Sequence, residues 1–97
     1  MTPLEAYLDS RENGPSGINR KIVCKDSYWA YAYAFSVDQC PRDDTREAVC
    51  KDPYWAYAYA YNIDKCFHEK TCQTIKNTQY KGQYEKLIHS FMKEEII

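Results

Sequence analysis

Aromatic and small residues alternate along two stretches of the chain, YWAYAYAFSV at residues 28–37 and YWAYAYAYNI at residues 54–63. Alternation with a period of two is typical of a half-buried strand. As a strand, however, either stretch would place small residues on one face and aromatic rings on the other, with no polar face. Alanine favours helices, and Asp52-Pro53 is a helix start signal. The pattern therefore predicts helices with aromatic ridges separated by alanine grooves, and the strand is the alternative.

The two stretches belong to a sequence repeat. Shifting the chain by one repeat length aligns Cys24 with Cys50, Asp26 with Asp52, and Cys40 with Cys66. The segment PRDDTREAVC at residues 41–50 begins with proline and places acidic residues in its first turn, which predicts a second, shorter helix. A repeat of about 26 residues is typical of stacked supersecondary units with divergent terminal copies. We expect one all-α domain, a small right-handed α-solenoid of short helical hairpins, with units at about 1–23, 24–49, 50–75 and a C-terminal cap at 76–97.

Both ends of the chain carry helix signals of their own. Thr2, Pro3 and Glu5 fit a capping box that opens an N-terminal helix, which Asn13-Gly14 should close. Near the other end, apolar residues recur at helical spacing, at positions Tyr80, Tyr84, Leu87, Ile88 and Phe91. This stripe predicts a terminal helix that packs on the last repeat.

The charge of the chain does not identify a partner. Thirteen basic and 14 acidic side chains leave a net charge of -1, which argues against a general binder of polyanions. No apolar run is long enough to span a bilayer, and the first residues lack the features of a signal peptide. We therefore expect a cytoplasmic protein that does not contact a membrane.

Cysteine and histidine are the candidate metal ligands. Four of the five cysteines recur at the repeat period, which would separate equivalent thiols by about 9–10 Å, too far for a disulfide. We expect small buried thiols in a reducing compartment. A metal site at Cys66, His68 and Cys72 is the alternative, but these residues lack the paired spacing of structural zinc sites. No cofactor is expected, and no nucleophile motif or glycine-rich phosphate loop points to an enzyme.

Ten tyrosines are more than a small helical core needs. Tyrosine and tryptophan contribute much of the binding energy at protein interfaces, so part of this set is expected to contact a partner. On the helical wheel Tyr31 and Tyr57 lie beside Asp38 and Asp64, which predicts an exposed position, whereas Trp29 and Trp55 are predicted to lie in the core. The full set of candidate contact residues is Tyr31, Tyr33, Tyr57, Tyr59 and Tyr61. Stacking of single-stranded nucleic acid is the competing use, but the first two repeats lack a basic groove.

Phrases such as DPYWAYAYA and CPRDDTREAVCKDPYWAY resemble tandem repeats of small proteins from phages and large DNA viruses. The resemblance is strong over residues 15–66 and weak in the flanks. It implies a viral helical repeat protein without catalytic residues. Small phage proteins of this size often inhibit a host protein, including components of defence systems such as CRISPR, or bind another phage protein. The resemblance thus implies a host or phage protein as partner, in the host cytoplasm. Binding of nucleic acid or of a small ligand by exposed aromatic residues is the alternative function.

Overall fold

The computed structural model describes residues 1–96, with side chains described for residues 1–92. Every regular element in this part of the chain is helical, as the sequence predicts, and it contains no strand. In chain order the elements are α1 (Pro3–Asn13), α2 (Gly17–Val23), α3 (Ser27–Tyr33), the π-helix η1 (Ala34–Asp38), α4 (Asp43–Val49), α5 (Pro53–Tyr59), the π-helix η2 (Ala60–Asp64), α6 (Glu69–Ile75) and α7 (Lys81–Ile96).

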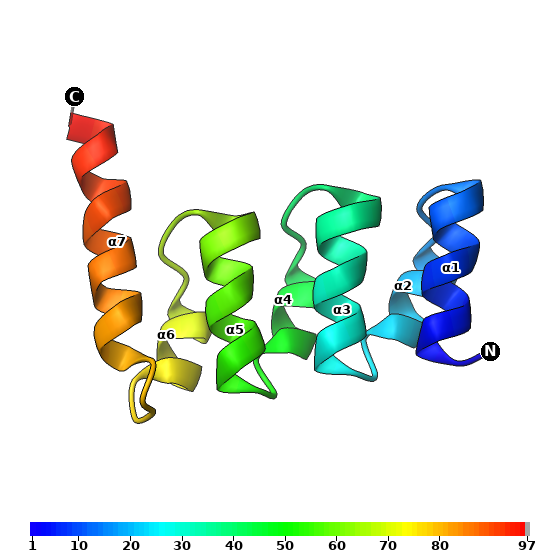
Figure 1. Cartoon of the computed structure of the whole chain (residues 1–97), viewed down its shortest axis with the longest axis horizontal. Helices are drawn as coiled ribbons and strands as arrows, with labels where there is room; N and C mark the ends of the chain where they lie inside the picture. Colours follow the sequence, from blue (N-terminus) through cyan, green and yellow to red (C-terminus); the bar gives the residue numbers. More distant parts are fainter. Residues whose placement is uncertain (97) are drawn as a thin grey trace.

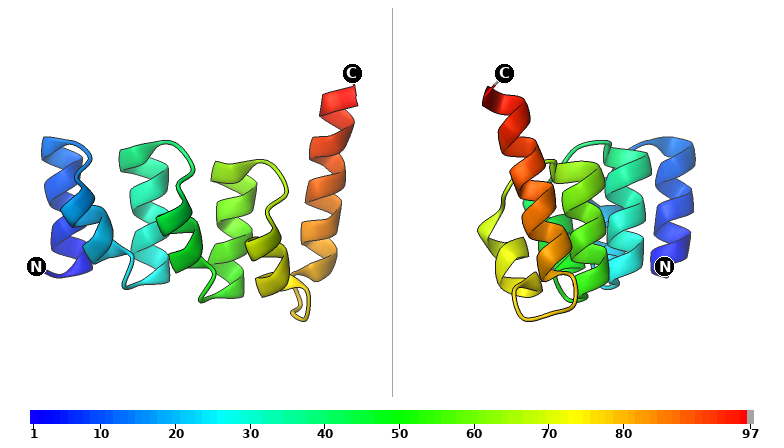
Figure 2. Two further views of the ribbon diagram at one scale, coloured as in Figure 1. Left: turned by 180° about the vertical axis from the view of Figure 1, so that it is seen from behind. Right: turned by 60° about the vertical axis from the view of Figure 1, so that its left-hand side comes forward.

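The helices form two layers (Figure 1). Four segments lie side by side in a row: α1, α3 with η1, α5 with η2, and α7. We call them the long helices. The seven-residue helices α2, α4 and α6 form a second layer, which is nearer to the viewer from behind (Figure 2). Helix α5 begins one repeat length after α3, and the same shift separates η2 from η1 and α6 from α4. The result is a slab of 41 × 30 × 15 Å in which one arrangement recurs along the long axis.

The predicted helix starts are present. The Thr2 N–H donates to Glu5 Oε1 at 2.9 Å and the Glu5 N–H donates to Thr2 Oγ1 at 3.2 Å, which completes the capping box. Asp26 and Asp52 each accept a hydrogen bond at 2.9 Å from the backbone N–H two residues further on. Gly14, at φ 96°, follows the last residue of α1, as the sequence predicts.

The helices predicted at residues 28–37 and 54–63 are present, but they are not α-helical to their ends. Each continues into a turn of π-helix and stops at a residue in the left-handed conformation, Gln39 at φ 55° and Lys65 at φ 54°. The N–H of Gln39 donates to the Ala34 carbonyl at 2.9 Å, and Lys65 makes the same contact with Ala60. A π-turn takes up more residues than an α-turn, so it rotates the following side chains around the helix axis.

The alanine grooves receive the next repeat unit. Ala30 and Ala34 of α3 pack with Val49 and Tyr59, and Ala56 and Ala60 of α5 pack in the same way with Ile75 and Tyr84. Because alanine has a short side chain, it leaves room between the helices for the tyrosine ring of the next one. The core therefore lies between repeat units, and one tyrosine from each later unit fills it.

The hydroxyl groups of these core tyrosines cap the short helices. Tyr59 Oη accepts from the Arg42 N–H at 2.9 Å, donates to the Arg42 carbonyl at 3.1 Å and lies 2.8 Å from Thr45 Oγ1. Tyr33 makes the equivalent contacts with the Ser16 backbone. Arg42, the N-cap of α4, offers no capping side chain of its own, so a residue 17 positions away supplies the partner.

Buried ion pairs join α2 to η1 and α4 to η2. Arg46 Nε and Nη2 donate to the two carboxylate oxygens of Asp64 at 2.9 and 2.6 Å, and Arg20 donates to Asp38 in the same way. The side chain of Asp64 is only 1% exposed, and that of Arg46 is 9% exposed. The hydrogen bonds to these carboxylates raise the pKa of both arginines above its usual value.

The last unit lacks this ion pair. Cys72 and Ser90 stand one repeat length after Arg46 and Asp64, so neither charge is present. Tyr84 lies one position earlier than the repeat period requires, and its hydroxyl is 3.4 Å from the His68 backbone. Thr71, the equivalent of Thr45, is buried with no hydrogen-bond partner for its hydroxyl group. The polar contacts between repeat units therefore weaken at the C-terminal end.

Candidate functional site

Aromatic rings form a continuous series across the row of long helices, which we call the aromatic ladder. Tyr7 of α1 contacts Trp29 of α3 at a centroid distance of 5.3 Å, and Tyr28 of α3 contacts Trp55 of α5 at 5.1 Å. Tyr54 of α5 then contacts Tyr80, just before α7, at 6.0 Å. The rings in this series are Tyr7, Tyr28, Trp29, Tyr31, Phe35, Tyr54, Trp55, Tyr57, Tyr61 and Tyr80. The aromatic residues thus connect neighbouring repeat units at the surface as well as in the core.

Several rings of the ladder are open to solvent. Tyr28, Phe35, Tyr54 and Tyr61 are 44%, 52%, 50% and 55% exposed, and the other rings of the ladder are half-buried. The rings contact one another in edge-on, tilted and stacked arrangements, so neighbouring rings restrict one another before any partner binds. Rigid aromatic area of this kind is the usual source of hot spots at protein interfaces, because little side-chain entropy is lost on binding.

Part of the ladder forms an open pocket on α5 and η2. It has a volume of about 220 Å³ and is lined by Tyr54, Tyr57, Ala58, Tyr61 and Asn62. The Asn62 side-chain amide donates to Tyr31 Oη at 2.9 Å and so fixes the ring of the preceding unit. Burial raises the pKa of the Tyr31 hydroxyl, which therefore stays neutral near physiological pH.

Three of the predicted contact residues lie in the ladder, and two do not. Tyr31, Tyr57 and Tyr61 are ladder residues. Tyr33 and Tyr59 are fully buried, so the structure contradicts their prediction as contact residues. Their rings fill the space between repeat units, and their hydroxyls cap α2 and α4.

The tryptophans and the tyrosines Tyr31 and Tyr57 do not differ in burial as the helical wheel predicts. The side chains of Asp38 and Asp64 were expected to mark the polar side of the helix, but both are buried in ion pairs. Trp29 and Trp55, predicted to lie in the core, are half-buried, as are Tyr31 and Tyr57. Because every long helix packs on several sides, a helical wheel does not separate its exposed face from its inner faces.

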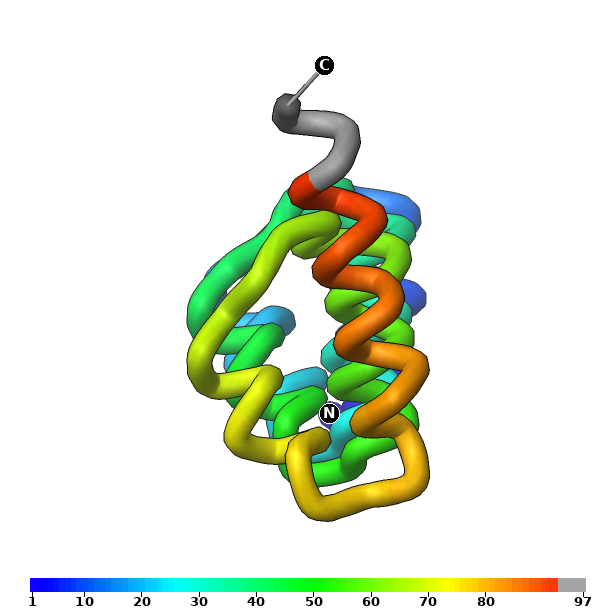
Figure 3. Tube along the Cα trace, turned by 90° about the vertical axis from the view of Figure 1, so that its left-hand side faces the viewer, coloured from blue at the N-terminus to red at the C-terminus, as the bar shows by residue number. Residues whose placement is uncertain are grey.

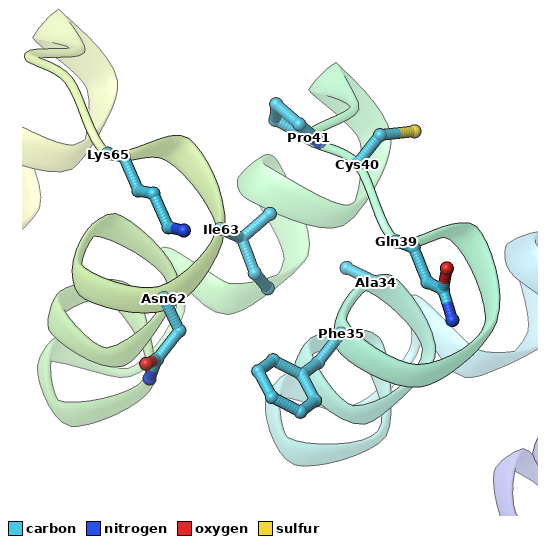
Figure 4. Close-up of a pocket in the computed structure, with 8 residues that line it drawn as sticks. All are labelled: Ala34, Phe35, Gln39, Cys40, Pro41, Asn62, Ile63 and Lys65. Carbon is cyan, nitrogen blue, oxygen red and sulfur yellow. The ribbon is translucent and has the colours of Figure 1, made fainter.

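A second pocket lies between the ends of η1 and η2 (Figure 4). It has a volume of about 260 Å³, and Phe35, the solvent-facing end of the ladder on η1, forms one wall. Its other lining residues are Ala34, Gln39, Cys40, Pro41, Asn62, Ile63 and Lys65, so the lining holds one ammonium group and no carboxylate. The pocket therefore offers apolar contact area beside a positive charge.

The alternative metal site is not assembled. Among the residues whose side chains are described, no group of three or more His, Cys, Asp or Glu side chains lies in a position to hold a metal ion. His68 Nε2 lies 3.6 Å from Asp64 Oδ1, and Cys72 packs against the apolar cluster of Ala56 and Ile75. His68 thus approaches the carboxylate of the buried ion pair.

The thiols are less buried than the sequence predicts. Cys40 is exposed, and Cys24, Cys50 and Cys72 are half-buried and free. Burial, reinforced by the charge of Asp44, raises the pKa of the Cys24 thiol to about 11. Cys24 and Cys40 therefore occupy different environments, although both belong to one repeat unit.

We expect Cys40 to react with a maleimide much faster than Cys24 in the folded protein. Thiolate is the reactive form, and at about pH 8 a thiol with a pKa near 11 is ionised in only about one molecule in a thousand. Peptide mapping by mass spectrometry after brief labelling measures both rates, and labelling of the denatured chain is the control. Equal rates at the two cysteines in the folded protein would contradict the different environments.

Comparison with known protein families, with curated proteins and with solved structures finds no match to this chain. Within the residues that the structure describes, no helix has both the length and the apolar character needed to cross a bilayer.

Proposed function

We propose that this chain is a small right-handed α-solenoid of helical-hairpin repeats that acts as a non-enzymatic protein-binding module. The observation that carries the proposal is the aromatic ladder, a series of partly exposed rings that crosses the whole row of long helices. Solenoids commonly bind partners through extended surfaces to which each repeat contributes. Here every repeat unit contributes rings to the ladder, so the contact surface grows with the number of units.

The composition of the surface favours a protein over a nucleic acid. Single-stranded nucleic acid stacks on aromatic rings when a basic groove follows its backbone. Two cations lie at separate points of the ladder, Arg11 over the Tyr7 ring and Lys65 in the pocket that Phe35 lines, whereas Arg20 and Arg46 use their charges in buried ion pairs. The aromatic ladder is therefore better suited to bind a protein surface that offers apolar side chains.

The resemblance to viral repeat proteins supports a more specific proposal. We propose a phage-encoded inhibitor that binds a host protein in the host cytoplasm, for example a component of a defence system such as CRISPR. Inhibition by such a module needs only that it covers a functional surface of its target. The proposal of the inhibitor role rests on the resemblance, whereas the proposal of protein binding rests on the ladder.

The test is capture of a partner by the tagged chain from host lysate, repeated with a Tyr61→Ala variant. Tyr61 is 55% exposed, so its replacement should leave the melting temperature unchanged and weaken binding by about 2 kcal/mol, roughly 30-fold. Ile18→Ala, at an exposed apolar residue of α2, is the matched control and should bind at full strength.

One stoichiometric protein that the wild type and the Ile18 variant retain and the Tyr61 variant loses supports the proposal. Co-purification of RNA or a nucleotide would support the alternative function instead. Equal capture by all three proteins would exclude the ladder as the binding surface.

A further inference from the structure

The end of the row formed by α6 and α7 carries an apolar groove. Two adjoining pockets of about 230 and 390 Å³ share Phe67, Ile88 and Met92 in their linings. The segment around Phe67 and the helix α7 are the parts nearest to the viewer when the row is seen from this end (Figure 3). Phe67 is 50% exposed and Met92 is 55% exposed. We call this surface the α6–α7 groove.

The groove lies at the junction that lacks the buried ion pair. In the preceding junction the long side chain of Arg46 crosses from α4 to Asp64 and fills the space between the helices. Cys72, its equivalent, is short and apolar, and it lines the groove together with Tyr84. The junction between α6 and α7 therefore has an apolar opening beside the position where the preceding junction has an arginine.

The opposite end of the row exposes a matching apolar ridge. Leu4 and Leu8 of α1 are one turn apart and are 45% and 54% exposed. They lie on the side of α1 away from its buried residues, Ala6 and Ser10. Two leucines at i and i+4 on an exposed helix are the typical anchors by which a helix binds an apolar groove.

The two ends also differ in charge. Residues 65–92, which surround the groove, contain five lysines and two glutamates, a net charge of +3 with neutral histidines. One of these glutamates, Glu85, lines the groove itself, and the lysines lie outside its lining. Helix α1 contains Glu5, Asp9 and Glu12 against Arg11, a net charge of -2. Opposite charges on the two ends favour their approach and oppose contacts between like ends.

We propose that α1 of one copy docks through Leu4 and Leu8 into the α6–α7 groove of a second copy, head to tail. The contact joins two different surfaces, so each copy keeps one unused end and assembly continues along the row direction unless a ring closes. Each added copy also extends the row of long helices. This self-association uses the ends of the slab and does not depend on the proposed protein partner of the ladder.

The test is the molar mass in solution, measured by sedimentation over a range of concentrations, for two variants that each disable one end. Leu4→Lys with Leu8→Lys disables the ridge, and Met92→Lys disables the groove. All three positions are exposed, so the fold should persist, which circular dichroism verifies. Each variant alone should associate roughly tenfold or more weakly than the wild type. Ile18→Lys, an equally exposed change on α2, should associate normally.

Mixing the two variants provides the decisive observation. The ridge variant keeps its groove and the groove variant keeps its ridge, so the mixture should form a one-to-one dimer that neither forms alone. Added salt should weaken this dimer, because opposite charges at the surface are screened. A wild type that remains monomeric at about 1 mM, or a mixture that remains monomeric, would overturn the proposal. Retained self-association of either variant alone would indicate a contact between like surfaces and would overturn it as well.

Discussion

Replacing Arg46 with methionine lowers the free energy of unfolding by about 3–5 kcal/mol, because the Asp64 carboxylate is then buried without its partner. A domain of this size is stable by only about 5–15 kcal/mol, so the variant is expected to be largely unfolded or close to it. Urea denaturation followed by circular dichroism measures the change.

Two further variants separate the charge effect from loss of packing. The double variant Arg46→Met with Asp64→Leu removes both charges and should recover most of the stability, since an apolar pair can replace a buried ion pair. Asp43 is the other partner of Arg46, and its side chain is fully exposed. The change Asp43→Asn should lower the free energy of unfolding by no more than about 1 kcal/mol. A double variant no more stable than Arg46→Met would show that the ion pair itself is not the source of the loss.

The second large loss of stability is expected for Tyr59→Ala. The cavity that this change leaves between repeat units should lower the free energy of unfolding by about 3–5 kcal/mol. Phenylalanine fills the same space but leaves the Arg42 N–H without its partner, which should lower the free energy of unfolding by about 1–3 kcal/mol. Burial raises the pKa of the Tyr59 hydroxyl, so this group is neutral and able to donate at physiological pH.

Tyr61→Ala is the matched control for Tyr59→Ala, because the two residues are neighbours in the aromatic pattern and differ in burial. Tyr61 is 55% exposed, and its replacement should change the stability by no more than about 0.5 kcal/mol. Thermal melts of Tyr59→Ala, Tyr59→Phe and Tyr61→Ala rank the three variants by their loss of stability. Equal losses at Tyr59 and Tyr61 would contradict the separation of core and ladder.

The sequence predicts the local structure of this chain well, because local interactions decide it. The capping residues Thr2, Asp26 and Asp52 bond to backbone groups within three residues of themselves, so their positions are visible in the sequence. The repeat is likewise visible when the sequence is aligned with itself after a shift of one repeat length. These features are sufficient to predict helices in place of strands at residues 28–37 and 54–63.

The parts that depend on distant residues are not predicted. Arg46 and Asp64 both recur in the repeat, but they are far apart in the chain, and nothing local indicates that they pair. The π-turns contain no proline or glycine that would mark a departure from α-helix. The prediction of Tyr33 and Tyr59 as contact residues is wrong for a related reason, since alanine grooves on one helix accept rings from the next and the wheel shows one helix only.

The aromatic ladder itself is only partly predicted. The ridge of Tyr28, Tyr31 and Phe35 can be drawn on one helix, but the contacts that join Tyr28 to Trp55 and Tyr54 to Tyr80 cross from one helix to the next. Its residues can be chosen from composition, whereas their arrangement as a continuous surface requires the packing of the row.

The replacement of the buried ion pair by Cys72 and Ser90 makes the stability of the array uneven along its length. In a linear array each unit is coupled only to its neighbours, and the strength of each junction sets how far a local opening spreads. The junctions at Arg20 and Arg46 each combine an ion pair with a tyrosine cap, whereas the junction of α6 with α7 has a long tyrosine contact and, among the described side chains, no such ion pair. Opening should therefore begin at α7 and stop at the Arg46 junction. Because Arg46 of α4 holds Asp64 of η2, the segment from α1 to η2 is expected to be the last part of the molecule to exchange its amide hydrogens with water.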